Sequence, residues 1–510
     1  MNSFWDTLAS INDRINTIVW VQIGLVLLIG TGILMTVVTR FFQVTQIKLW
    51  WKKTVAGMFK KDAHNKKEHG SVSQFQALCT ALAATIGTGN IAGVAAAIVV
   101  GGPGAVFWMW VVAFFGMMTN FSENVLGIYY RRKNKQGEWS GGPMYYLKDG
   151  LGRLTGYETI GKILAVLFAC FAILASFGIG NLGQINKIVI NIESAFFSGV
   201  NAPKVVGDAT VVALGIGIAL MIVGALIIIG GLKRIAAVAE RVVPFMAILY
   251  VIGALVVFLF HVNSIGAVFA SIFRFAFGIK AVGGAAVGVT IKTVAVQGCK
   301  RGAFSNEAGL GSSVMVHSNS NVKEPVKQGM WGVFEVFADT MVVCTMTAVV
   351  VLSSGFIDLQ TGLPVEGTSD ATLVAQAFGN VFGKPGEWFI AIAMLLFAFT
   401  TVLGWSHYGS KAVEYLFGSL GVKIYRVFFV CLIVSGALMT SSIAWDISDT
   451  FNGLMMIPNL IGVVALSPVV VKITRNYIDR KVHNKDVAPV VSYDEEIQRE
   501  MAEAIKNGEE

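Results

Sequence analysis

Long runs of apolar residues alternate with short polar segments along almost the whole chain. Each run is near 20 residues or longer, which is enough for a helix to cross about 30 Å of hydrocarbon. Charged residues make up 14% of the chain, against roughly 25% in a soluble domain. The pattern predicts an all-α polytopic membrane protein with about eleven transmembrane helices. The predicted spans are residues 17–39, 71–99, 104–130, 160–187, 209–231, 242–262, 282–315, 328–354, 386–415, 423–443 and 447–471.

The loops between these spans divide by charge. Most lysines and arginines fall in loops on one side of the predicted membrane, including 131–135, 232–241 and the tail after Lys472. Cytoplasmic loops carry such an excess, so we expect the N-terminus outside, the C-terminus in the cytoplasm, and a multi-pass protein of the cell (inner) membrane. The net charge of +8 is therefore no sign of nucleic-acid binding.

Four shorter segments also have predicted structures. The basic stretch 40–69 interleaves aromatic residues with lysines, which favours a helix lying on the inner membrane surface or, alternatively, a solvated loop. Residues 264–278 and 371–382 predict external or re-entrant helices. In the tail, Ser492 and Glu495 have capping-box spacing, which predicts a short, solvated cytoplasmic helix.

Ten residues, ATIGTGNIAG (84–93), interrupt a long apolar run with glycines, threonines and an asparagine. Hydrocarbon offers no water to an unpaired backbone, so a broken helix at this depth survives only inside protein or beside an aqueous cavity. Free amides of the outer half-helix would bind a carboxylate, and free carbonyls of the inner half suit sodium or an ammonium group. The interruption indicates a carrier; a glycine-rich packing face is the alternative.

A second interruption, GCKRGAFSNEAGLGSS (298–313), follows five spans later. Because five is odd, two five-helix repeats would insert with opposite topology, as in inverted-repeat carriers. We therefore expect a peripheral helix and interfacial helix in 1–70, a first repeat in 71–262, a second repeat in 263–475 and a cytoplasmic tail in 476–510.

Three strings resemble signature stretches of the alanine or glycine:cation symporter family, the sodium:alanine symporters: GGPGAVFWMWVVAFFG (101–116), GGPMYYL (141–147) and RGAFSNEAGLGSS (301–313). With the first interruption, the resemblance covers about residues 17–475. It implies a leucine-transporter-type fold, a 5+5 inverted repeat with broken first and sixth core helices plus one peripheral N-terminal helix. It also implies sodium-coupled import of small neutral amino acids, alanine or glycine, by alternating access.

The resemblance assigns site residues to both interruptions and to the helices facing them. It implies substrate binding by Thr85, Thr88, Gly89, Asn90, Asn181, Gln184 and Gly298. It implies a sodium site made by Ala83, Ile86, Asn90, Asp339, Thr400 and Thr401. Hinge or gate positions would be Gly87, Gly302, Ser305, Asn306 and Glu307. Oxygen-only coordination suits sodium, a hard cation.

Several of these residues have structural alternatives. Thr400 and Thr401 could bond back to carbonyls of their own helix, and Asn181 and Gln184 could bridge neighbouring helices. Asp339 could serve only as a carboxylate bonded to a neighbouring helix.

Three further charged residues within predicted spans, Glu123, Glu335 and Lys292, are candidates for a functional role. We expect Glu123 to form an interfacial ion pair above Arg131 and Arg132. Glu335 and Asp339 are four apart, hence on one helix face. Lys292, just before the second interruption, could pair with a carboxylate such as Asp339, but the sequence cannot pair the two.

No enzyme signature or phosphate-binding loop is present, and the five scattered cysteines have no metal-binding spacing. We expect no cofactor beyond sodium as coupling ion, no transition metal, and a monomer whose partners are the amino acid, sodium and the lipid bilayer. A glutamine symporter of the same family, a channel, or a substrate-sensing receptor are the competing hypotheses.

Overall fold

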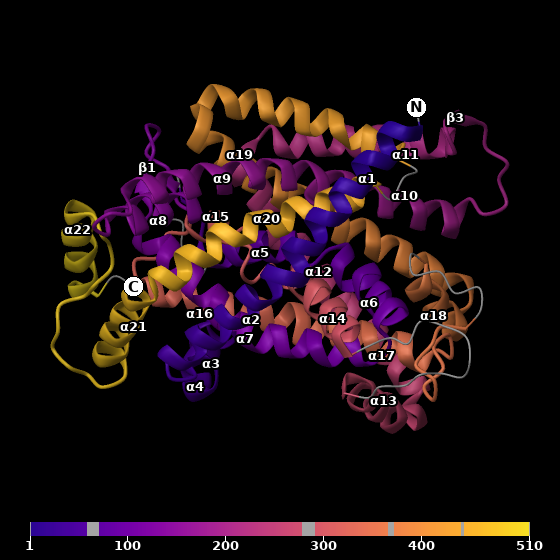
Figure 1. Cartoon of the computed structure of the whole chain (residues 1–510), viewed down its shortest axis with the longest axis horizontal. Coiled ribbons are helices and arrows are strands. Elements are labelled where there is room, and N and C mark those ends of the chain that lie inside the picture. Colours follow the sequence, from indigo (N-terminus) through magenta and orange to yellow (C-terminus); the bar gives the residue numbers. More distant parts are fainter. Residues whose placement is uncertain (1, 59–70, 278–290, 366–371, 440–442, 509–510) are drawn as a thin grey trace.

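Helices dominate the computed structural model, which describes residues 2–58, 71–277, 291–365, 372–439 and 443–508. The long helices run alongside one another through the molecule, and the two short β-hairpins lie at its ends (Figure 1). The polytopic, all-helical prediction is confirmed for the described residues: eight helices are long and apolar enough to cross a membrane, or nine if one bent pair is a single span.

The elements of the first half are bounded as follows: α1 Asn2–Asn16, η1 Thr17–Gly24, α2 Leu25–Val38, α3 Phe42–Thr45, α4 Ile47–Lys53, η2 Val55–Gly57, α5 Gln74–Thr85, η4 Gly89–Gly93, α6 Val94–Gly101, α7 Gly104–Tyr129, β1 Arg132–Lys133, β2 Trp139–Ser140, α8 Pro143–Asp149, η5 Leu151–Arg153, α9 Glu158–Phe177, η6 Gly178–Leu182, α10 Gly183–Phe196, β3 Lys204–Val206, β4 Ala209–Thr210, α11 Val211–Ile228 and α12 Gly231–Phe260.

Those of the second half are η7 Val262–Ser264, α13 Ile265–Phe277, α14 Ile291–Asn306, α15 Val314–His317, α16 Pro325–Val336, η8 Phe337–Cys344, α17 Thr345–Ser353, α18 Leu373–Phe382, α19 Lys384–Ala437, α20 Ile443–Ala465, α21 Ser467–Lys481 and α22 Glu495–Lys506. The segments η1, η4, η6 and η8 are π-helical, so each widens the helix in which it lies.

Helix α19 is two helices joined at a kink. Gly418 has φ 68° and ψ −165°, a conformation that glycine reaches without the steric cost of a Cβ. The kink falls between the predicted spans 386–415 and 423–443. The chain therefore turns at a position that the sequence places in a loop.

The two ends of the molecule carry different elements. Figure 1 places α21, α22 and the hairpin strand β1 at one end, and α13, α18 and the hairpin strand β3 at the other. The helices predicted at 264–278 and 371–382 are α13 and α18.

The predicted interfacial helix exists only as short pieces. Residues 40–58 form α3, α4 and the 3₁₀ turn η2, with Phe41, Val44 and Trp51 exposed. Residues 59–69 lie outside the described residues.

The tail helix α22 has a different cap and a different environment from those predicted. The Asp494 side chain caps the helix by accepting from the amides of Glu496 and Ile497. Ser492 instead accepts from the amide of Asp494. The helix is also packed rather than fully solvated, because Met501 forms a buried cluster with Trp139.

Candidate functional site

The first interruption is present and bends its helix. A capping box between Ser73 and Gln76 starts α5, satisfying two amides that would otherwise lack partners. The helix ends at Thr85, and Gly89–Gly101 continues at 50° to it. Residues Ile86, Gly87 and Thr88 connect the halves and are buried. The prediction of a broken helix is confirmed.

The break frees a carbonyl for another helix. The Gly87 amide donates to the Asn90 side-chain oxygen over 2.9 Å, rather than to Ala83 four residues back. The Ala83 carbonyl instead accepts a 3.1 Å bond from the Thr401 hydroxyl. The approach is tight, because a Cβ on Gly87 would lie 2.3 Å from the Thr401 oxygen. Thr401 and Ala83 thus place two oxygens together at the break.

Thr400 is turned away from this point. Its hydroxyl donates to the Phe397 carbonyl at 2.9 Å and lies 3.6 Å from the sulfur of Met246. The Thr401 hydroxyl also bonds back to the Phe397 carbonyl, at 3.1 Å, so both threonines make the bond to their own helix, but Thr401 in addition contacts Ala83. Ile86 lies within the connector, and its amide bonds to Leu82. The Thr85 hydroxyl bonds back to Ala81 at 3.2 Å.

Two buried side-chain oxygens, those of Thr88 in the break and of Asn181 in η6, have no partner among the described residues. The Thr88 amide donates to the Gln184 side-chain oxygen at 3.2 Å, but the Thr88 hydroxyl is unpaired. The Asn181 amide group donates to the Phe429 carbonyl at 2.7 Å, while its own oxygen is unpaired. Buried polar atoms are normally satisfied, so the Thr88 and Asn181 oxygens are candidate ligand contacts.

Asp339 joins the two interrupted helices. One of its carboxylate oxygens accepts from Asn90 at 2.6 Å, and the other accepts from Ser305 and Thr340, both at 2.8 Å. Asn306 donates in turn to the Thr340 hydroxyl at 3.0 Å. Asp339 is fully buried, and these donors provide the compensation that a buried carboxylate requires.

The second interruption lies in the later part of the predicted stretch 298–313. Helix α14 is continuous through Gly298 and Gly302 as far as Asn306, so both glycines lie before the break in this conformation, and their roles in binding and as a hinge stay predictions. A Cβ on Gly298 would lie 2.3 Å from the Ala105 carbonyl, and one on Gly302 would lie 2.6 Å from Val112. Both glycines allow α14 to pack closely against α7.

The backbone instead leaves the helix at Glu307. This residue has φ 55°, and Gly309 and Gly311 also have positive φ. Glu307 is buried and accepts a 2.5 Å bond from the Ser312 hydroxyl across the turn. The prediction that Glu307 lies at the second interruption is confirmed.

Glu123 belongs to this second break and not to an interfacial ion pair. It is fully buried and accepts from Asn459 at 2.5 Å, and Asn459 also donates to the Gly309 carbonyl at 2.8 Å. Arg131 bonds to backbone carbonyls and Arg132 pairs with Asp149. No sequence pattern pointed to Asn459, which lies more than 300 residues from Glu123.

Glu335 and Asp339 have different partners despite their helical spacing. Glu335 contacts His317 at 2.9 Å, and His317 contacts Gln328 at 2.5 Å. The π-helical segment η8 begins between the two carboxylates and changes the register of the turn. Lys292 is exposed at the first turn of α14, whereas the Asp339 cluster is buried.

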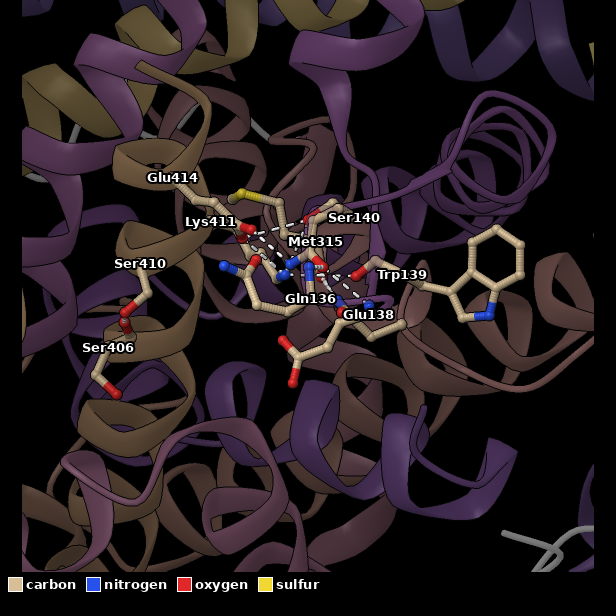
Figure 2. A network of polar contacts seen from close by, with 11 residues as sticks. Gln136, Glu138, Trp139, Ser140, Met315, Ser406, Ser410, Lys411 and Glu414 are labelled. Atoms are coloured by element: carbon tan, nitrogen blue, oxygen red, sulfur yellow. Dashed lines mark hydrogen bonds and ion pairs between the residues drawn. The ribbon is translucent and has the colours of Figure 1, made fainter. Parts of the chain in front are cut away.

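A cavity of about 440 Å³ opens at the end of the molecule that carries hairpin β1–β2. His407, Ser410 and Lys411 on α19 line it. Figure 2 shows Lys411 and Glu414 reaching toward Ser140 of the hairpin. The Lys411 ammonium group lies 2.9 Å from both Ser140 and Glu414. Helix α19 thus contributes both residues that line this cavity and Thr401 at the first break.

Comparisons with known proteins agree on one family. The model of the sodium:alanine symporter family matches residues 5–491. The sodium/alanine symporter AgcS of Methanococcus maripaludis is 42% identical, over 92% of this chain and 97% of that protein. An uncharacterized transporter of Haemophilus influenzae is 40% identical, over 95% and 100%. The probable sodium/glutamine symporter GlnT of Bacillus subtilis is 36% identical, over 92% and 91%.

The fold is also found among solved structures. The crystal structure of MhsT in complex with L-phenylalanine aligns with a TM-score of 0.54 at 13% identity, covering 80% of this chain and 99% of that one. At this identity the likeness concerns the fold alone.

Proposed function

Because the chain belongs to the sodium:alanine symporter family, we propose that it imports a small neutral amino acid, alanine or glycine, together with sodium. The family establishes a membrane transporter and not an enzyme. The observation that carries the proposal is the first break, where the Ala83 carbonyl is released from its helix and meets the Thr401 hydroxyl at 3.1 Å. Broken helices of this kind hold ions and substrates in secondary transporters.

Sodium binds at the carbonyl end of the break. Ala83, Ile86 and Thr401 supply oxygen atoms, which a hard cation prefers. The Ala83–Thr401 contact fits this role, since both oxygens already point at one place. Thr400 would have to turn from Met246 to join them. Asp339, held by Asn90 and Ser305, is the anionic group of a second cation position.

The amino acid binds at the amide end of the same break. Amides near Gly89 face its carboxylate at a helix N-terminus, and the unpaired oxygens of Thr88 and Asn181 accept from its ammonium group. Both glycines pack closely on aromatic residues, since a Cβ on Gly89 would lie 3.1 Å from the Phe304 ring and one on Gly180 would lie 2.4 Å from Trp405.

The complete architecture belongs to the same proposal. Eleven spans form two inverted five-helix repeats behind one peripheral helix, in a monomer of the cell membrane with its N-terminus outside. The 440 Å³ cavity beside Lys411 then opens to the cytoplasm. Sodium and substrate stabilise one another at the break, and the two repeats move to expose the site to each side in turn. The membrane potential contributes about 2.3 kcal/mol per charge per 100 mV.

A glutamine symporter is the second candidate, because the probable sodium/glutamine symporter GlnT is 36% identical to this chain. The higher identity to the sodium/alanine symporter AgcS, 42%, favours alanine. A channel or a sensor would show no coupled, saturable flux.

Uptake of labelled alanine into proteoliposomes, with sodium or potassium outside, tests the proposal. Unlabelled glycine, D-alanine and glutamine serve as competitors. We expect saturable uptake only with the sodium gradient, and competition by glycine but not by glutamine. Sodium-driven uptake of glutamine without alanine would overturn the substrate, and absence of coupled flux from folded protein would overturn the carrier.

A further inference from the structure

A buried ion pair joins two helices on the side of the site away from the 440 Å³ cavity. Lys300 of α14 contacts the carboxylate of Asp449 on α20, and the two side chains are only 14% and 3% exposed. Helix α20 runs from the neighbourhood of α1 toward α21 and the tail (Figure 1). Asp449, near its beginning, is thus at the end remote from the tail. Buried charge pairs in membrane proteins are costly and mark functional positions.

The pair lies directly beyond the first break. Lys300 and Phe304 are four residues apart on α14 and share one face. Phe304 covers Gly89, where a Cβ would lie 3.1 Å from its ring. Beside Asp449, Ser448 packs against Gly178 at the start of η6, the segment that carries Asn181. Lys300 and Asp449 are therefore each within one helical turn of a residue packed on the substrate-binding elements.

The N-terminal helix supports both members of the pair. The Asn16 side-chain oxygen accepts from the Lys300 ammonium at 3.2 Å, and the Trp20 indole donates to the Asp449 carbonyl at 3.0 Å. Asn16 also donates to Thr450 at 3.0 Å. Gly453 gives Trp20 room, since a Cβ there would lie 2.7 Å from the indole nitrogen.

Asp449 is only half satisfied. Its second carboxylate oxygen is buried and has no partner among the described residues. A buried carboxylate that serves only to hold two helices together would be expected to have both oxygens bonded. The incomplete bonding fits a contact that must break and form again.

We infer that the Lys300–Asp449 ion pair is the outer gate of the transport pathway, and that Asn16 and Trp20 of the N-terminal helix hold it closed. The inference rests on the proposed function, which assigns this end of the molecule to the outside of the cell. With the pair formed and the cavity beside Lys411 open at the opposite end, the structure corresponds to an inward-facing arrangement. The peripheral helix is then part of the gating machinery.

A cysteine reporter beneath the pair tests this inference. Thr88→Cys places a thiol at a buried position of the first break. A membrane-impermeant maleimide is added outside oriented vesicles, and the labelling above that of the parent with its native cysteines is measured. Asp449→Asn and Lys300→Met should each raise the labelling rate roughly tenfold or more. Removing one partner leaves the other charge buried and unpaired, which strongly shifts the equilibrium from the closed to the open gate.

Further variants separate gating from damage. Asp208→Asn, which removes an exposed carboxylate paired with Lys204 between β3 and β4, is the control and should leave the rate unchanged. The double variant Lys300→Met/Asp449→Asn leaves no isolated charge and should keep the high rate. Asn16→Ala should raise the rate roughly fivefold, the effect of about one hydrogen bond.

Several results would overturn the inference. These are parental labelling in folded Asp449→Asn protein, a return to the parental rate in the double variant, or increased labelling only from the cytoplasmic side. Failure of the proposed function appears separately, as absence of sodium-driven alanine uptake by the unmodified protein, since the labelling needs no substrate.

Discussion

At the scale of single residues, the site depends on a few side chains that form hydrogen bonds with backbone groups left unpaired where the helix is interrupted. Asn90 has two roles, since its oxygen accepts from the Gly87 amide and its nitrogen donates to Asp339. Thr401 takes the carbonyl that this arrangement releases. Because unpaired buried backbone groups are costly, each of these side chains both maintains the break and shapes what can bind there.

Thr401→Ala should raise the sodium concentration for half-maximal uptake roughly tenfold, because it removes one oxygen at the cation position. Thr401→Ser keeps the hydroxyl and should stay near the parental value. Thr400→Ala is the neighbouring control, and its hydroxyl faces Met246. Sodium titrations of alanine uptake measure all three. An equal effect of the two alanine variants would contradict the orientation seen here.

Asn90→Ala should reduce the alanine kcat/KM by roughly a hundredfold or more, because it leaves the Gly87 amide and one Asp339 oxygen unpaired together. Asn191→Ala is a suitable control, since Asn191 bonds to the Lys187 carbonyl within its own helix. Initial uptake rates at saturating sodium provide the comparison. Near-parental transport by Asn90→Ala would remove this residue from the site.

At the scale of elements, the two interrupted helices are held in different ways. The first break is crossed by Asn90 and Thr401, whereas the second is fixed by Glu123 and Asn459 from α7 and α20. Before that second break, α14 stays helical and lies against α7 through Gly298 and Gly302. In this part of the chain, α14 therefore packs closely against α7, and the backbone unwinds only after α14 ends.

Gly298→Ala should lower the unfolding temperature in detergent, because its Cβ would lie 2.3 Å from the Ala105 carbonyl and overpacking costs about 1–3 kcal/mol. Gly215→Ala on α11, with no heavy atom near its Cβ position, should leave the unfolding temperature unchanged or raise it. A Gly298→Ala protein with parental stability and no transport would instead support a direct role in binding or as a hinge.

Sequence reasoning located elements better than it located their contacts. The first break was predictable because glycines and polar residues clustered inside an apolar run are unfavourable in hydrocarbon unless the backbone opens there. The second interruption was predictable as the stretch 298–313, but the residue at which α14 ends was not, because a glycine that permits close packing, such as Gly302, looks the same in sequence as one that permits a turn. Similarly, Ser492 has capping spacing, but Asp494 forms the cap.

The roles of buried carboxylates required the fold. Glu123 is near arginines in sequence, yet its partner Asn459 comes from another helix. Glu335 and Asp339 share helical spacing, but the π-helical segment η8 separates their environments. Long-range pairs of this kind depend on helix packing, which a single sequence does not specify.

At the scale of the whole molecule, the two ends are chemically different. One end carries the tail, the hairpin β1–β2 and the cavity beside Lys411, and the other carries α13, α18 and the hairpin β3–β4. The tail is anchored near its start by a bidentate contact between Arg480 and Glu324, with both distances 2.7 Å. An asymmetric molecule of this kind suits directional transport.

The orientation predicts which segments reagents can reach. A protease site placed after Lys506 should be cut only from the cytoplasmic face, and one placed in the β3–β4 loop near Gly207 only from outside. Digestion of right-side-out and inside-out vesicles, followed by detection of the fragments, measures this. Cleavage with the opposite sidedness would reverse the proposed topology.

If sodium and the amino acid bind together at the first break, each must change the affinity of the other. Titration calorimetry of the purified protein can measure alanine binding in sodium and in potassium, and sodium binding with and without alanine. We predict that each ligand increases the binding affinity of the other by the same factor, and that Thr401→Ala reduces this factor. Equal alanine affinity in sodium and potassium would contradict a shared site.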